Sequence, residues 1–244
     1  MRLSELLHLI AETAQATGLS EPYLVGGVPR DKVLSKLHKF NDLDLTTGDS
    51  GIHYLAKEVS LALQPQPFSY QKLSDGHARI LLGDLKLDFS SNFNVPNIEK
   101  LLAKLQIHQP NEMEKELYSR DFTCNTLLLS LDLKRIEDHT RRAMHDIQNK
   151  VLQTCLPPEI TLGSDPKRVV RAIYLAAKLE FVLSNEVRTW IQNNPGALVA
   201  PGSGYVTKKL TKAFSYNSKI TRDLLQELNL MPYLPPSSEL APFL

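Results

Sequence analysis

The sequence is poor in the residues that mark several large classes of protein. Its 244 residues include only two cysteines, Cys124 and Cys155, so neither a disulfide framework nor a cysteine-based zinc site is expected. No apolar run approaches the roughly 20 residues of a membrane-spanning helix, and the N-terminus lacks the apolar block of a signal peptide. We therefore expect a cytoplasmic protein with reduced thiols and no membrane partner.

Charge of either sign is also not in excess. The chain has 28 Lys and Arg residues against 27 Asp and Glu residues, for a formal net charge of +1. A polyanion would therefore have to be bound by a local patch rather than by the whole molecule. The hydrophobic content of 42% is that of an ordinary folded protein, which excludes a fibrous or disordered chain.

The hydrophobic pattern changes near residue 136. Before it, short strands are predicted at 23–25 and 42–46 and a hairpin at 78–90, with helical segments between them. This part, residues 1–135, is predicted to be an α+β domain in which a mixed sheet carries helices on one face. Residues 122–131 fit either a last strand or a buried helix.

The remainder of the chain has helical periodicity. Asp165 and Pro166 are suited to the start of a helix, and a buried stripe follows them. We assign residues 136–235 to an all-α second domain and residues 236–244 to a tail.

A glycine pair lies between the first predicted strand and the next helix. Gly26 and Gly27 would let backbone N–H groups approach a ligand, and a helix that begins near Pro29 favours anions at its N-terminus. Arg30 lies one turn into that helix, where a guanidinium can pair with phosphate. A tight turn with a surface arginine explains the same residues.

Two aspartates alternate with leucines on the second predicted strand. The strand period of two puts Asp42 and Asp44 on one face and Leu43 and Leu45 on the other. Adjacent carboxylates repel unless something neutralises them, and Mg²⁺ does so through oxygen ligands. A metal site and a solvated strand edge remain equal alternatives at this point.

Asp88 adds a third carboxylate. It alternates with the apolar residues of the hairpin and so faces the polar side together with Lys86. A neighbouring strand can present Asp88 to the same metal ions, an arrangement used in two-metal phosphoryl transfer. The alternative is an ordinary exposed aspartate.

Two further groups of polar residues follow. The first has Arg120 and Asp121 on one side of an apolar stretch and Asn125 on the other, which indicates either a site wall or a surface ion pair.

The second group lies at the start of the helix near residue 166. Arg168 and Arg171 share one helix face beside Asp165, so they form either a solvated face or a set of donors and acceptors for a base edge.

In this order, the motifs resemble those of the class II tRNA nucleotidyltransferases and bacterial poly(A) polymerases. These proteins belong to the DNA polymerase β-like nucleotidyltransferase superfamily. The similarity covers roughly residues 20–182. It comprises the Gly-Gly-x-x-Arg-Asp turn at 26–31, the Asp-x-Asp at 42–44, the Arg-Asp-Phe-Thr-x-Asn at 120–125 and the Asp-Pro-x-Arg-x-x-Arg at 165–171.

The resemblance implies a catalytic head at 1–135 and a helical neck at 136–235. Two Mg²⁺ ions would be held by Asp42 and Asp44, with Asp88 as the third catalytic carboxylate. Nucleotide-binding residues would come from all four motifs: Gly26, Gly27, Arg30, Arg120, Asp121, Asn125, Asp165, Arg168 and Arg171. The implied substrates are CTP and ATP, and the implied activity is template-independent addition of CCA to the tRNA 3′ end with release of pyrophosphate.

Four positions depart from the family pattern. After the third carboxylate, Asn92 and Phe93 stand where an arginine is usual. Ser164 stands where Glu usually precedes the neck Asp, and Tyr174 stands where a further arginine is common. Pro29 replaces a usual valine. None of these departures removes a metal ligand, so activity is expected. The property that they are expected to affect most is the discrimination between CTP and ATP.

The second half of the chain is locally basic. Residues 165–223 contain ten basic and four acidic residues, which predicts an RNA-binding track that includes Lys208, Lys209 and Lys212. Helix-surface lysines without a partner are the alternative. Because head and neck occupy the whole chain, the larger body and tail of family members have no room here. The basic segment, or a second subunit of a homo-oligomer, is expected to hold the RNA.

Three other functions fit part of the pattern. An A-only or poly(A)-type polymerase would use the same chemistry. A non-catalytic RNA-binding relative would keep the fold without the carboxylate chemistry. A small-molecule nucleotidyltransferase would need the carboxylates but not the neck motif.

Overall fold

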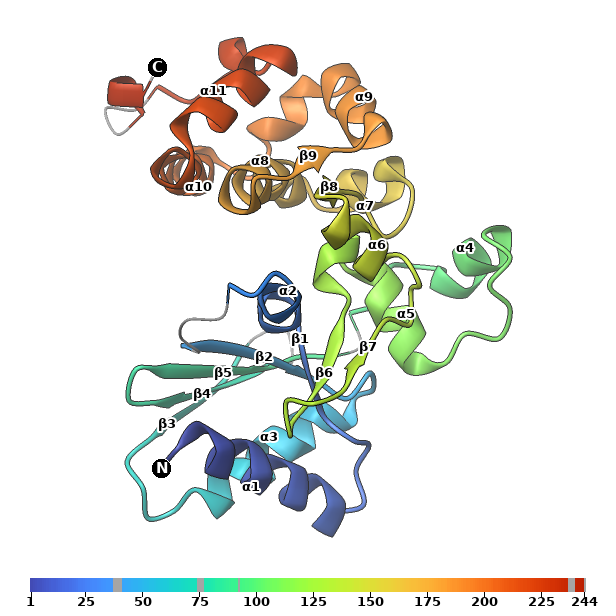
Figure 1. The fold of residues 1–244 in the computed structure, drawn as a ribbon, viewed down its shortest axis with the longest axis vertical. Coiled ribbons are helices and arrows are strands. Elements are labelled where there is room, and N and C mark those ends of the chain that lie inside the picture. The colour runs from blue at the N-terminus through green and yellow to red at the C-terminus, as the bar shows by residue number, and fades with distance from the viewer. Residues whose placement is uncertain (37–40, 74–76, 92, 237–239, 244) are drawn as a thin grey trace. The chain divides into compact units, whose positions relative to one another are not determined.

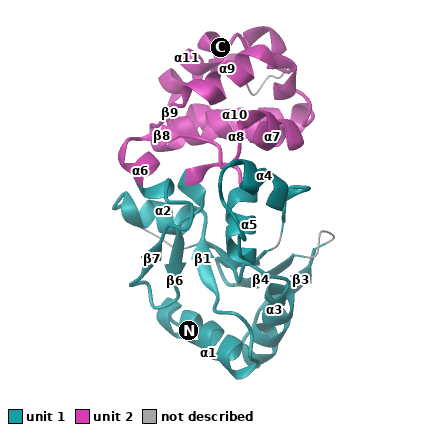
Figure 2. Ribbon diagram, turned by 90° about the vertical axis from the view of Figure 1, so that its right-hand side faces the viewer, with its two compact units in different colours: residues 1–119, 124–144 teal, residues 120–123, 145–244 magenta. Residues whose placement is uncertain are grey.

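The computed structural model describes residues 1–36, 41–73, 77–91, 93–236 and 240–243. They form two compact units (Figure 2): Met1–Ser119 with Cys124–Met144, and Arg120–Thr123 with His145–Leu244. The first unit extends past the boundary expected at residue 135 because β7 (Ile136–Glu137) pairs with β6 (Leu128–Ser130) of its sheet. No helix in the described residues is both long and apolar enough to cross a membrane.

The first unit is built on a seven-stranded mixed sheet with the order β3-β4-β5-β2-β1-β6-β7 (Figure 1). Its other strands are β1 (Tyr23–Val25), β2 (Asp42–Thr46), β3 (Ser69–Lys72), β4 (Ala78–Leu82) and β5 (Leu85–Phe89). The predicted strands and the hairpin are confirmed, and Gly83 takes the positive φ of +57° that its two-residue turn requires. The exposed edge strand β3 was not predicted.

Helices α1 (Leu3–Ala16) and α3 (Gly51–Ala62) cover one face of this sheet. The expectation of helices on that face alone is incomplete, because α5 (Glu112–Ser119) packs Leu117 against Val25 and Leu128 on the opposite face. The shorter helices are α2 (Gly27–Val33) and α4 (Ile98–Lys104).

The second unit is mainly helical. Its helices are α6 (Ala143–Gln148, which begins in the first unit), α7 (Pro158–Ser164), α8 (Lys167–Leu179), α9 (Asn185–Asn193), α10 (Ser203–Tyr216) and α11 (Ser218–Glu227). The expectation of an all-α domain needs one correction: a short parallel pair joins β8 (Val151–Leu152) to β9 (Val182–Leu183). These two-residue strands are too short to be recognised from periodicity.

Two shorter segments also belong with this unit. Residues 120–123 join it because Phe122 bridges to Thr154 and the Thr123 N–H donates to the Gln153 carbonyl at 2.9 Å. In the expected tail, the Phe243 ring stacks on Phe214 with centroids 4.9 Å apart, whereas 237–239 and 244 lie outside the described residues.

Candidate active site

Three aspartates of the first unit are gathered on one face of its sheet. Strands β2 and β5 run parallel, with Asp42 opposite Lys86 and Asp44 opposite Asp88. Leu43 and the other apolar residues of β2 are buried on the reverse face. Carboxylate oxygens of Asp42, Asp44 and Asp88 lie within 4.8 Å of one another, Asp42 being exposed and the other two half-buried. The grouping expected from strand alternation is therefore present.

Cations of the β4–β5 hairpin are paired with this cluster. The Lys86 Nζ lies 2.8 Å from Asp42 Oδ1 and 2.9 Å from Asp88 Oδ2. Arg79 donates to both Asp88 oxygens, at 2.6 and 3.1 Å. Burial raises the pKa of Asp88, but hydrogen bonds from Arg79 and Lys86 outweigh it and bring the pKa below its usual value. The Asp88 carboxylate is thus ionised over the physiological range.

The donor set fits a hard divalent cation. All three side chains offer carboxylate oxygens, the ligands that Mg²⁺ prefers, and they are close enough to share metal ions. Lys86 and Arg79 compete for the same oxygens, so a bound metal would displace part of this ion-pair network.

Arg79 was missed by the sequence reasoning, although the signal was available. A two-residue turn at Gly83 and Asp84 fixes the register of the hairpin and places Arg79 directly opposite Asp88.

The glycine turn is packed against the carboxylate cluster. Gly26 has φ +78° and ψ −121°, a conformation that is strained for any residue with a side chain. A Cβ added at Gly26 would also lie 3.1 Å from Asp44 Oδ2. Glycine is therefore required here both for the chain reversal and for the space that Asp44 occupies.

Arg30 and Asn125 lie together although they are far apart in the sequence. The Arg30 side chain is only 3% exposed, and its Nη1 donates to Asn125 Oδ1 at 2.6 Å. Its Nε and Nη2 lie 2.8 and 2.7 Å from Asp31 Oδ1. The structure thus joins two of the expected nucleotide-binding motifs within the first unit and makes Arg30 a buried support for the Asn125 amide.

A buried polar network joins the C-terminal end of β2 to α5. The Thr46 hydroxyl donates to the Glu116 carboxylate and lies 2.6 Å from Ser91 Oγ, which accepts from the Thr47 N–H at 2.9 Å. Glu116 is 3% exposed. The network thus ties α5 to β2, a connection that sequence patterns did not reveal.

The remaining expected residues lie in the second unit. Asp121 is largely buried and accepts from Arg171 Nε at 2.8 Å, while Arg171 Nη2 lies 2.6 Å from the same oxygen. The other carboxylate oxygen of Asp121, Oδ1, accepts from the Phe122 N–H. Arg171 thus holds the Asp121 carboxylate, and its expected role beside the base-contacting pair stays a prediction.

The expected base-contacting pair lies at the start of α8. Asp165 Oδ1 accepts from the Lys167 N–H at 3.0 Å, and its Oδ2 lies 4.0 Å from Arg168 Nε. The Arg168 Nη1 donates to the Thr161 carbonyl at 3.2 Å. A carboxylate and a guanidinium are therefore held side by side at a helix terminus.

Lys208, Lys209 and Lys212 lie on α10, a helix that was not predicted as such. At position 174, where the resemblance led us to expect arginine, Tyr174 lies beneath the Lys209 Nζ at 4.8 Å from the ring centroid.

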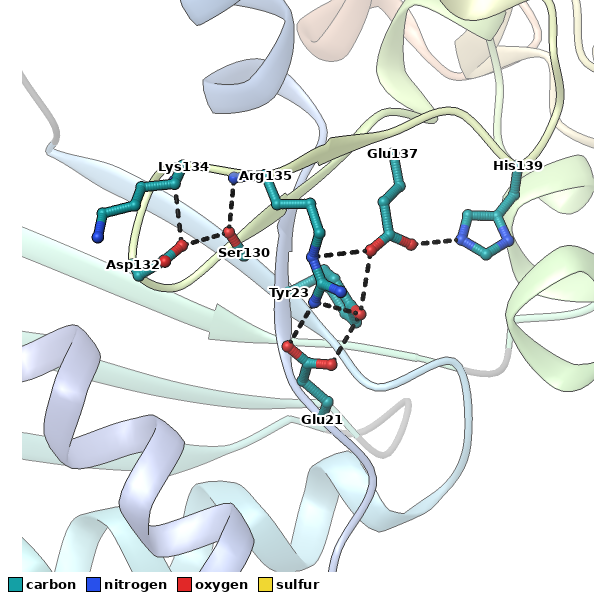
Figure 3. Close-up of polar contacts among 8 residues, drawn as sticks. All are labelled: Glu21, Tyr23, Ser130, Asp132, Lys134, Arg135, Glu137 and His139. Atoms are coloured by element: carbon teal, nitrogen blue, oxygen red, sulfur yellow. Dashed lines mark hydrogen bonds and ion pairs between the residues drawn. The ribbon is translucent and has the colours of Figure 1, made fainter.

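A separate ionic cluster occupies the β1–β6–β7 edge of the first unit (Figure 3). Arg135 Nη2 contacts Glu21 at 2.7 Å, and its Nε lies 3.1 Å from Glu137, which also pairs with His139. Tyr23 donates to Glu21 at 2.9 Å. Burial, and then the two glutamates, raise the pKa of Tyr23 to about 12.

Comparison with known proteins agrees with this geometry. Residues 22–153 match the family described as the poly A polymerase head domain. The chain is 29% identical over 211 residues to the tRNA nucleotidyltransferase cca2 of Schizosaccharomyces pombe, covering 78% of this chain and 42% of that protein. It is also 29% identical over 171 residues to the A-adding tRNA nucleotidyltransferase of Aquifex aeolicus, covering 66% of this chain and 19% of that one.

The fold is shared with a solved structure. The Bacillus stearothermophilus CCA-adding enzyme in complex with CTP superposes with a TM-score of 0.74 at 20% identity, over 98% of this chain and 55% of that chain. This chain thus spans less than two thirds of these relatives. Because more than half of it matches the head-domain family, the chain belongs to the poly A polymerase head-domain family, which confirms its resemblance to the class II tRNA nucleotidyltransferases.

Proposed function

We propose that the protein adds nucleotides to the 3′ end of tRNA from nucleoside triphosphates, without a template. The observation that carries this proposal is the cluster of Asp42, Asp44 and Asp88, whose oxygens lie within 4.8 Å of one another. Membership of the poly A polymerase head-domain family and the names of the two relatives support the same reaction and the same substrates.

The three carboxylates would hold two Mg²⁺ ions. Such ions, when bound, lower the pKa of a hydroxyl nucleophile and stabilise charge on a pyrophosphate leaving group. The protein's own contribution is to hold the ligands in place: Gly26 leaves the space that Asp44 fills, and the sheet register sets Asp44 beside Asp88.

The other motif residues would bind the nucleotide. Asn125, oriented by buried Arg30, offers an amide to the sugar or phosphates. Asp121, oriented by Arg171, offers a fixed carboxylate to a ribose hydroxyl. Each pair keeps a polar group in one position before the substrate arrives, which reduces the entropy lost on binding.

Asp165 and Arg168 would select the base. Cytosine and adenine both carry an exocyclic amine beside a ring-nitrogen acceptor, so an acceptor carboxylate next to a donor guanidinium matches both. Guanine and uracil present a carbonyl where the amine would be, and a carboxylate, which only accepts hydrogen bonds, does not match it. CTP and ATP are therefore the proposed substrates.

The extent of addition is tested by supplying one labelled nucleotide at a time. Purified protein with Mg²⁺ is incubated with tRNA ending at the discriminator base, or with tRNA that already carries CC, and products are resolved by length. We expect CMP on the first substrate and AMP on the second. AMP on the CC-ended substrate alone would mean an A-adding enzyme, the second candidate, since one relative is A-adding.

A non-catalytic role is the outcome that would overturn the proposal. It would be indicated if folded protein bound tRNA but incorporated none of the four nucleotides on either substrate. Incorporation of GMP or UMP at rates equal to CMP and AMP would retain the transfer chemistry but contradict the role given to Asp165 and Arg168.

A further inference from the structure

Two helices of the second unit, α8 and α10, pack against each other, and all of their charged residues are basic. They contain seven Lys and Arg residues and no Asp or Glu. The seven are Lys167, Arg168, Arg171, Lys178, Lys208, Lys209 and Lys212. Carboxylates normally separate such charges on a solvated helix surface, so their absence from both helices needs an explanation.

Basic residues and tyrosines are interspersed on both helices of this pair. Each helix has a stripe with spacings of four, three and four residues, which places its members on one face. The stripes are Lys167, Arg171, Tyr174 and Lys178 on α8, and Tyr205, Lys209, Lys212 and Tyr216 on α10. We call these eight residues the cation–aromatic ladder.

The contacts of the ladder cross from one helix to the other. Lys167 Nζ lies 5.9 Å from the Tyr205 ring centroid, and Lys178 Nζ lies 5.8 Å from that of Tyr216. The rings of Tyr174 and Tyr216 meet edge to face at 5.8 Å. The first residues of the two stripes therefore pair with each other, as do the last, Lys209 contacts Tyr174 between them, and the ladder runs for about 16 Å along the helices.

Like charges in the ladder repel one another. Burial lowers the pKa of Lys209 most, and the positive charges of Arg171, Lys212, Lys208 and Lys178 lower it further. Arg171 is paired with Asp121, but the three lysines of α10 face no carboxylate on either helix. An anionic ligand would relieve this repulsion, which is the situation expected of a polyanion site.

We propose that the cation–aromatic ladder binds a single strand of RNA. Its phosphates would lie along the lysines, and an unpaired base would stack on Tyr216, a residue that is 52% exposed. Tyrosine rings spaced among cations suit a flexible strand with accessible bases better than a duplex, whose bases are stacked inside. This inference rests on the proposed function, because it gives the growing RNA strand a place on the second unit.

The test is binding of a fluorescent single-stranded RNA of about 12 nucleotides, measured by anisotropy without Mg²⁺ or nucleotide. The variant Lys178→Ala/Lys209→Ala/Lys212→Ala should weaken binding by about 10-fold or more at low salt. It should also reduce the slope of log K against log salt by about 2, since each phosphate contact on a single strand contributes about 0.7.

A matched control removes the same charge elsewhere. Lys57→Ala/Lys100→Ala/Lys104→Ala changes three exposed lysines of α3 and α4 and should keep binding within about twofold of wild type. Tyr216→Ala should weaken binding, whereas Tyr216→Phe, which keeps the ring, should not. Circular dichroism confirms that each variant is folded.

The proposal is overturned if the ladder variant binds like wild type, or if the control variant loses as much affinity. Tighter binding of a duplex of equal length, with no effect of Tyr216→Ala, would also contradict it. This binding assay needs no catalysis. A protein that incorporates no nucleotide would therefore not contradict RNA binding by the ladder, and a ladder that binds no RNA would not contradict the proposed reaction.

Discussion

Gly26 shows how a single backbone position serves the carboxylate cluster. Its φ of +78° and the 3.1 Å between an added Cβ and Asp44 Oδ2 are two separate constraints. The first is a cost of backbone strain and applies to any residue with a side chain. The second displaces a proposed metal ligand, so it bears on activity rather than on stability alone.

Gly26→Ala should therefore lower both stability, by about 1–3 kcal/mol, and nucleotide transfer, by about 10-fold or more. Gly18→Ala is the matched control, because Gly18 has φ +67° with no atom within 4 Å of an added Cβ. That variant should lose stability and keep transfer. Urea unfolding and incorporation assays on both variants check this, and equal activity losses in the two would contradict the role given to Asp44.

Tyr23 gives a pH-dependent signature that is separate from catalysis. Its pKa is about 12 in the folded protein and near 10 when unfolded, so the folded state keeps the phenol proton between these values. The stability that Tyr23 contributes is complete below pH 10 and is lost as pH rises from 10 to 12.

Tyr23→Phe lacks this titration. The Tm of wild type should fall more steeply than that of Tyr23→Phe between pH 10 and 12, so the two should converge. Thermal unfolding followed by circular dichroism at several alkaline pH values measures the difference. A Tm difference that does not change with pH would show that burial and the contacts to Glu21 and Glu137 do not raise the pKa of Tyr23.

At the scale of elements, the β4–β5 hairpin does more than complete the sheet. It brings Asp88 to the cluster and, from the same two strands, the cations Arg79 and Lys86 that pair with it. The hairpin thus supplies both a proposed metal ligand and the groups that compete with the metal.

Removing Lys86, which competes for the carboxylates, should raise the affinity of the cluster for a metal ion. Lys86→Met is expected to tighten Mn²⁺ binding by about 3- to 10-fold, because loss of a half-buried ion pair is worth about 1 kcal/mol. Lys86→Arg should leave the affinity near that of wild type. Free Mn²⁺ measured by electron paramagnetic resonance reports the affinity without catalysis, and weaker binding in Lys86→Met would contradict the competition.

The elements differ in how far the sequence predicts them. Strand β2 and the β4–β5 hairpin were predicted because alternation and a glycine turn are local signals. That Asp88 meets Asp42 and Asp44 was only one of two alternatives, because it depends on the parallel pairing of β2 with β5. Edge strand β3 is exposed throughout and has no alternation to detect. Helix α10 was missed because its stability depends on packing against α8, a tertiary contact.

Contacts between residues far apart in the sequence could not be predicted from it either. The pairs Arg30–Asn125 and Asp121–Arg171 join residues 95 and 50 positions apart, and no local pattern specifies such a pairing. The motifs indicated that these residues matter, while only the fold shows that each arginine supports a neighbour.

At the scale of the whole molecule, the net charge of +1 conceals an uneven distribution. Three carboxylates converge on the sheet of the first unit, and seven Lys and Arg residues lie on two helices of the second that contain no Asp or Glu. The proposed metal site and the proposed RNA-binding ladder are thus built on different units.

The proposed function requires that the carboxylate cluster drives nucleotide transfer to RNA. Its most direct test is incorporation of labelled CMP and AMP into tRNA lacking its 3′ end, with Mg²⁺, by wild type and by Asp44→Asn, with RNA binding measured in parallel. We predict incorporation by wild type and a loss of about 1,000-fold or more in Asp44→Asn, with RNA binding retained. Incorporation by Asp44→Asn at the wild-type rate would contradict the claim.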